Sequence, residues 1–135
     1  MIVVNLYFVE SLVDNIASLN LSDEEDTNLR QQIDPNNELD VKKIFKEWLV
    51  PIYKRWGTST KLKLKESLRY LLNSNDDDLF DLVAGGNEPP FEFPEPLINY
   101  FIWLWEVLFG NESYRIENLD EYVVNNQFGT INYLE

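Results

Sequence analysis

The chain has 135 residues, neither cysteine nor histidine, and a formal net charge of −13. Without cysteine there are no disulfides, thiolate metal sites or cysteine nucleophiles, and without histidine the commonest general base and transition-metal ligand are missing. Apolar residues make up 44% of the chain and aromatic residues 14%, which predicts one folded domain that buries a core.

Charge is separated into three blocks along the chain. Residues 42–69 contain nine of the eleven basic residues and only two acids, for a net charge of +7. Residues 1–41 carry a net charge of −8, and residues 70–135 carry one of −12. A chain polarised in this way has a long-range field, so we expect it to be steered toward charged partners.

The first third of the chain begins with two competing patterns. Apolar residues at spacings of three and four predict an amphipathic helix over residues 2–19. Strand formers are dense in residues 2–9, so a strand is the rival interpretation for the start of this segment. Residues 21–37 are polar and predict a connection, with a short helix as the alternative because Ser22 and Glu25 have capping-box spacing.

The clearest helix covers about residues 40–56. Its apolar residues form one broad face, its basic residues fall mostly on the opposite face, and Asn37 or Asp40 is placed to cap it. Pro51 predicts a kink, because proline removes a backbone donor and clashes with the preceding turn. Gly57 is expected to end the helix.

Two further helices are predicted in the middle of the chain. The first covers residues 59–73 with Ser59 as its cap, although residues 60–65 alternate between polar and apolar as a strand would. The second is short and covers residues 75–83. Three aspartates in its first turn complement the helix dipole, and a Gly-Gly pair closes it.

The last third contains the most apolar segment. Residues 88–96 include four prolines and predict an extended, polyproline-like stretch. Pro96 then suits the first turn of a helix over residues 97–109, which is apolar nearly all round. A short helix over residues 116–125 and an extended piece over residues 130–134 complete the chain.

These elements predict a mainly α fold. We expect residues 1–135 to form a single compact domain of five or six helices around the two tryptophan-bearing helices, with a minor strand element at the termini left open. The first ten residues lack the basic region of a secretory leader, and residues 97–109 are too few to span a membrane. The expected protein is cytoplasmic and has no membrane partner.

Acidic residues are candidates for metal binding or acid–base chemistry, and they cluster at residues 23–26, 76–81, 88–95 and 117–121. An EF-hand loop beginning at Asn73 fails twice, because Asp78 replaces the required glycine and Ala84 replaces the final glutamate. We therefore expect no catalytic residue, metal or cofactor. Metal-dependent hydrolysis by carboxylates alone is the one chemistry that the composition leaves open.

The basic block of residues 42–69 has two interpretations. It would bind nucleic acid if Trp48, Tyr53 and Trp56 were available for stacking on bases. These aromatics share the apolar face of their helix, however, and the rest of the chain, at −20, would repel a phosphate backbone. We expect the block to lie against the protein's own acids, without direct nucleic-acid binding.

The aromatic helix over residues 97–109 also has two interpretations. It is either the central core helix or a partly exposed interface in which Trp103 and Trp105 act as anchors. The proline-rich stretch before it either orients the helix or presents Phe91 and Phe93 to a partner. The interface interpretation predicts a structural or adaptor protein.

The leading functional hypothesis is a non-enzymatic acidic protein that inhibits a basic protein partner. Such a surface speeds encounter with cationic proteins and occupies sites meant for phosphate. The favoured class is an immunity-type protein that neutralises a nuclease toxin by occluding its cleft. The rival is a phage-type, nucleic-acid-mimicking inhibitor of a host defence complex. The candidate partner-binding residues are Asp76, Asp77, Asp78, Asp81, Glu88, Glu92 and Glu95.

Overall fold

The computed structural model of the chain describes residues 2–17, 24, 33–84 and 93–125. These residues contain two short strands, β1 (Ile2–Val4) and β2 (Tyr122–Val124), and a 3₁₀ turn (Leu119–Glu121) before β2. Their six α-helices are α1 (Tyr7–Ala17), α3 (Glu38–Ile44), α4 (Val50–Arg55), α5 (Thr58–Asn73), α6 (Asp77–Ala84) and α7 (Ile98–Phe109). The predicted fold class, a mainly α domain with a minor strand element near the termini, is confirmed.

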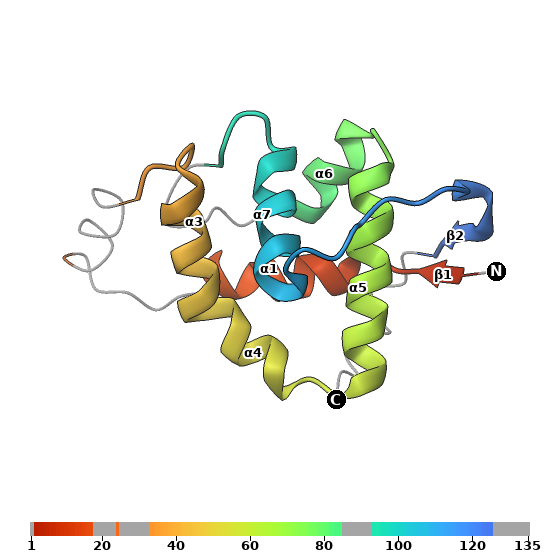
Figure 1. Cartoon of the computed structure of the whole chain (residues 1–135), viewed down its shortest axis with the longest axis horizontal. Helices are drawn as coiled ribbons and strands as arrows, with labels where there is room; N and C mark the ends of the chain where they lie inside the picture. The colour runs from red at the N-terminus through yellow and green to blue at the C-terminus, as the bar shows by residue number, and fades with distance from the viewer. Residues whose placement is uncertain (1, 18–23, 25–32, 85–92, 126–135) are drawn as a thin grey trace.

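Helix α7 lies at the centre of the fold. Figure 1 shows α3, α7 and α5 side by side, with α1 crossing behind them. One core cluster joins buried side chains from α1, α3, α5, α6 and α7, and α4 adds half-buried side chains at its edge. Five residues of α7 are buried, namely Tyr100, Phe101, Trp103, Leu104 and Trp105. Residues 97–109 therefore form the central core helix.

The start of the chain is a strand followed by a helix. β1 pairs in parallel with β2, with Val3 opposite Val123. Asn5 then ends the strand, and its side-chain Oδ1 accepts a hydrogen bond of 3.0 Å from the Tyr7 backbone N–H at the start of α1. The predicted helix is thus right for Tyr7–Ala17 and wrong for residues 2–4, while residues 18 and 19 lie outside the described part of the chain. The strand forms there because β-branched side chains meet a partner from the other end of the chain.

Residues 38–55 follow one continuous helical path with a π-helical turn (Phe45–Leu49) between α3 and α4. Asn37 caps α3, because its side chain accepts hydrogen bonds from two backbone N–H groups of the first turn. The Val50 N–H reaches Phe45 O, and Pro51 lies in the first turn of α4, where its missing N–H is not needed. The path bends between α3 and α4 (Figure 1), as Pro51 predicts.

Two local predictions were wrong. Ser59 does not cap α5, because Gly57 with extended backbone precedes that helix and Thr58 begins it. Gly57 is the N-cap residue of α5, and α4 ends at Arg55, before Gly57 as predicted, with Trp56 as its C-cap. Residues 116–125 form only the 3₁₀ turn and β2, since β2 pairs with β1 instead of continuing as a helix. The short helix predicted near residue 22, the Gly-Gly pair, most of the proline-rich stretch and residues 130–134 lie outside the described residues.

Truncating α7 in the core should destabilise the protein far more than the same change at the surface. Leu104 is fully buried, whereas Leu39 in α3 is 76% exposed. We expect L104A to lower the free energy of unfolding by about 2–5 kcal/mol, because it leaves a cavity. L39A should change it by less than about 0.5 kcal/mol. Urea unfolding followed by tryptophan fluorescence measures both, and equal losses would contradict the central position of α7.

Candidate functional site

Part of the basic block of residues 42–69 lies against acids of the same chain, through Lys42, Lys65 and Arg69. Lys42 Nζ in α3 lies 3.3 Å from Glu106 Oε2 in α7. The same Nζ lies 3.4 Å from Glu38 Oε1, four residues earlier in α3. Two helices that are far apart in the sequence are thus joined by one cation.

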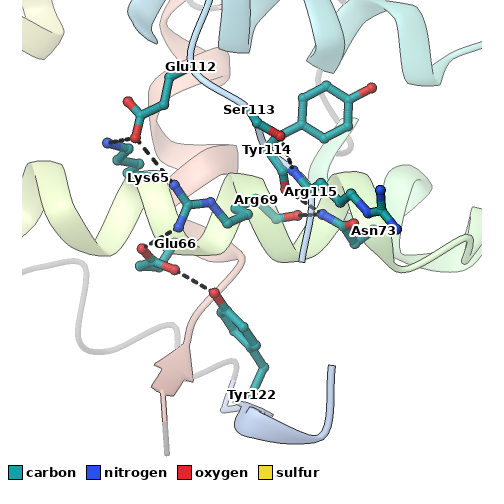
Figure 2. A network of polar contacts seen from close by, with 9 residues as sticks. All are labelled: Lys65, Glu66, Arg69, Asn73, Glu112, Ser113, Tyr114, Arg115 and Tyr122. Carbon is teal, nitrogen blue, oxygen red and sulfur yellow. Dashed lines mark hydrogen bonds and ion pairs between the residues drawn. The ribbon is translucent and has the colours of Figure 1, made fainter. Parts of the chain in front are cut away.

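A larger polar network runs along α5, and Figure 2 shows its members. Arg69 Nη1 lies 3.0 Å from Glu66 Oε1, and Arg69 Nη2 lies 3.6 Å from Glu112 Oε1. Lys65 Nζ lies 2.7 Å from the same Glu112 oxygen. Tyr122 Oη in β2 donates a hydrogen bond of 2.8 Å to Glu66 Oε2. Two cations and two carboxylates therefore neutralise one another. The prediction that the basic block pairs internally is confirmed for Lys65 and Arg69.

The cations of α5 also cover aromatic rings. Arg69 Cζ lies 5.3 Å from the ring centroid of Trp105, and Lys65 Nζ lies 5.2 Å from that of Phe109. The Trp105 indole N–H donates a hydrogen bond of 2.6 Å to the backbone oxygen of Glu112. Trp105 is 1% exposed and Trp103 is 8% exposed, so both candidate interface residues belong to the core.

Asn73, the last residue of α5, fixes the segment after α7. Its Nδ2 donates to Tyr114 O at 2.7 Å, and its Oδ1 accepts from the Ile116 N–H at 3.1 Å. The side chain therefore takes the place of a neighbouring strand for this segment, which has no ladder partner. It aligns the chain along α5 on its way to β2 (Figures 1 and 2).

Two of the three aromatics considered for base stacking pack against the core. Tyr53 meets the ring of Phe109 edge-on at 6.0 Å, and Lys61 Nζ lies 5.4 Å above the Tyr53 ring. Burial raises the pKa of Tyr53. Trp56 is half-buried against the core cluster, while Trp48 remains at the surface. The core interpretation therefore holds for Tyr53 and Trp56.

The acidic cluster of α6 is exposed and partly structural. The side chain of Asp76 accepts a hydrogen bond of 3.0 Å from the Asp78 N–H, so Asp76 acts as the cap of α6. Asp77 and Asp78 follow in the first turn, where negative charge complements the helix dipole. Asp81 lies beyond that turn. None of these four exposed carboxylates forms an ion pair with another described residue.

A groove of about 460 Å³ lies beside this cluster. It runs between α6 and the start of α7, and its described lining residues are Asn75, Asp77, Phe80, Asp81, Pro96, Leu97 and Ile98. Sequence reasoning found the two aspartates but missed the other five, because the contact between α6 and the start of α7 is tertiary. The one local signal was Pro96, which marks where α7 begins. A second hollow lies beside the polar network, between residues 105–106 and 110–115.

The remaining candidate residues lie on the other side of Pro96 or outside the described residues. Glu95 is exposed, and its backbone N–H donates a hydrogen bond of 2.9 Å to Asn36 Oδ1. Phe93 is half-buried and meets the ring of Tyr100 edge-on at 5.1 Å. It thus packs on α7. Glu88, Glu92 and Phe91 are outside the described residues.

The described residues contain no group of three or more acidic side chains arranged to hold a metal ion. Residues 73–84, tested above as an EF-hand, are the end of α5, a turn and α6 rather than a ligand loop. Among the same described residues, no helix has the length and apolar character needed to cross a membrane. The chain matches no family model, no curated protein and no solved structure.

The network around Glu112 should make stability depend on pH. The hydrogen bond from Lys65, helped by the charges of Lys65 and Arg69, lowers the pKa of Glu112 although desolvation opposes the shift. Folding therefore favours the ionised form. Its contribution is complete above the unfolded pKa near 4.5 and is lost as the pH falls through the lowered folded value.

We expect E112Q to be less stable than the wild type at pH 7, and this difference to shrink steadily between pH 5 and pH 3. Urea unfolding at each pH measures it. E117Q is the matched control, because Glu117 is exposed and has no ion pair with a described residue. A pH-independent difference for E112Q, or an equal effect of E117Q, would contradict the role of Glu112.

Proposed function

We propose that this chain is a non-enzymatic acidic protein that binds and inhibits a basic protein, as an immunity-type protein against a nuclease toxin. The single observation that carries the proposal is how the two signs of charge are used. Lys42, Lys65 and Arg69 are bound to acids of the same chain, whereas the aspartates of α6 are exposed without a described cation. Five other basic residues of the block are exposed, namely Lys43, Lys46, Lys54, Arg55 and Lys63. The surface therefore carries both signs, with the acids in excess at a net charge of −13.

Such a surface favours a basic partner for two reasons. Its field raises the rate of encounter with a positively charged cleft, and this effect falls as salt screens the charges. Once bound, carboxylates occupy the positions in which the cleft would hold phosphates, so the substrate is excluded. The inhibition is by occlusion and needs no catalytic group.

The internal ion pairs support the same reading. A basic block left in solvent would attract nucleic acid and would compete with a toxin for its own substrate. Because Lys42, Lys65 and Arg69 are neutralised within the fold, that competition is reduced. The aromatic side chains of α7 that an adaptor would present to a partner, such as Trp103 and Trp105, are buried in the core.

The direct test first isolates the basic partner, by capture on the immobilised chain from lysate of the source organism at low salt. The association kinetics of the chain with this purified partner are then measured. We expect D76N/D77N/D78N/D81N to lower the association rate constant by about tenfold at low salt and to leave the dissociation rate nearly unchanged. Asparagine at position 76 keeps the helix cap, so the variant should fold normally.

The matched control removes the same charge elsewhere. E47Q/E117Q/D120N/E121Q neutralises four exposed acids outside α6. We expect a clearly smaller effect from it, and a loss of the difference between the two variants at high salt. Association that is insensitive to salt and to both variants would overturn the proposal. The identity of the partner, a nuclease toxin or a nucleic-acid-guided defence complex, decides which kind of inhibition is involved.

A further inference from the structure

The groove between α6 and α7 combines two kinds of surface. Asp77 and Asp81 are four residues apart on one face of α6, so both carboxylates border the same side of the groove. Pro96, Leu97 and Ile98 at the start of α7 form an apolar opposite side. A hollow of about 460 Å³ with this lining is large enough for a long side chain from another protein.

The base of the groove is formed by packed aromatic rings. Phe80 is 4% exposed, and its ring lies 5.6 Å from the ring of Phe101 in α7, tilted by 32°. This contact fixes α6 against α7 and holds Asp77 and Asp81 in position. The groove is thus preformed, which lowers the entropic cost of binding.

Local structure accounts for some of the carboxylates but not for Asp81. Asp76 caps α6, and Asp77 with Asp78 complements the helix dipole. Asp81 lies outside the first turn and repels Asp77, because like charges four residues apart in a helix are destabilising. A cation in the groove would remove this repulsion.

We propose that the groove receives an arginine side chain of the basic partner. The proposal rests on the function proposed above and names its main anchoring contact. The methylene stem of arginine would lie on Pro96, Leu97 and Ile98, and its planar guanidinium, with five donors, would bridge Asp77 and Asp81. Lysine offers a single ammonium and is expected to bind more weakly.

Two other occupants fit the groove less well. A second copy of the chain carries the same net charge of −13 and would be repelled. A divalent cation would need several oxygen ligands in one shell. The described residues hold no group of three or more acidic side chains that could supply it.

Backbone NMR titration tests the proposal with a defined probe, N-acetyl-arginine N-methylamide. We expect the amide signals of Asp77, Asp81, Leu97 and Ile98 to shift most. The matched citrulline compound, which has the same shape without the charge, should leave them unchanged, and the lysine compound should shift them less. Equal shifts at the acids of residues 117–121, or equal responses to arginine and citrulline, would overturn the proposal.

Two double variants locate the binding site. D77N/D81N should weaken binding of the arginine compound by about tenfold, with about threefold for each carboxylate at an exposed site. E117Q/D120N removes the same charge outside the groove and should leave the affinity within about twofold. Equal effects of the two variants would show that the arginine compound is attracted by the overall negative charge and does not bind specifically in the groove.

The outcomes separate this inference from the proposed function. If salt-sensitive association with a basic protein survives but D77N/D81N and E117Q/D120N weaken it equally, the groove is wrong and the proposed function stands. If the arginine compound binds the groove but no basic partner associates, the proposed function is wrong and the groove remains a guanidinium site.

Discussion

The position of Arg69 is the constraint on which much of the fold depends. Its guanidinium contacts Glu66 in the same helix and Glu112 after α7, and it lies 5.3 Å from the Trp105 ring centroid. Glu66 in turn binds Tyr122 of β2. One cation therefore links the central core helix, the segment that follows it and the strand near the end of the described chain. The planar fork of arginine suits this position, because it can contact two carboxylates and an aromatic face at once.

The same helix places both strands. Ser67 of α5 accepts a hydrogen bond of 3.2 Å from the Asn5 N–H after β1, while Glu66 holds Tyr122 in β2. A two-stranded sheet is marginal by itself and needs packing against a helix. Here α5 supplies that support from neighbouring positions. Part of the charge separation seen in the sequence thus has a structural role. Lys42 pairs with Glu106, and Lys65 and Arg69 pair with Glu112, so cations of the basic block hold acids of the last segment.

Sequence patterns predicted the elements whose cause is local. The periodicity of α3, α5 and α7 follows from burial of one face, and Asn37 and Asp76 were recognisable as caps or first-turn acids. Pairing of β1 with β2 was not predictable in the same way, because their residues are about 120 positions apart and each strand has only three residues. The two hydrogen bonds between the Asn73 side chain and the segment after α7 were likewise not predictable from the sequence, since an asparagine at a helix end usually has only a local role.

The candidate site shows the same division. The acids of α6 are close together in the sequence and could be predicted. The apolar side of the groove, at Leu97 and Ile98, comes from a different helix. The packing of Phe80 on Phe101 brings the two sides together. A helix cap and its dipole account for one to three acids, whereas α6 with its cap has four. The surplus is Asp81, which raises electrostatic repulsion without a structural benefit among the described contacts. In the proposed complex, the arginine of the partner would offset this repulsion, so Asp81 is the position at which effects on folding and on binding can be told apart.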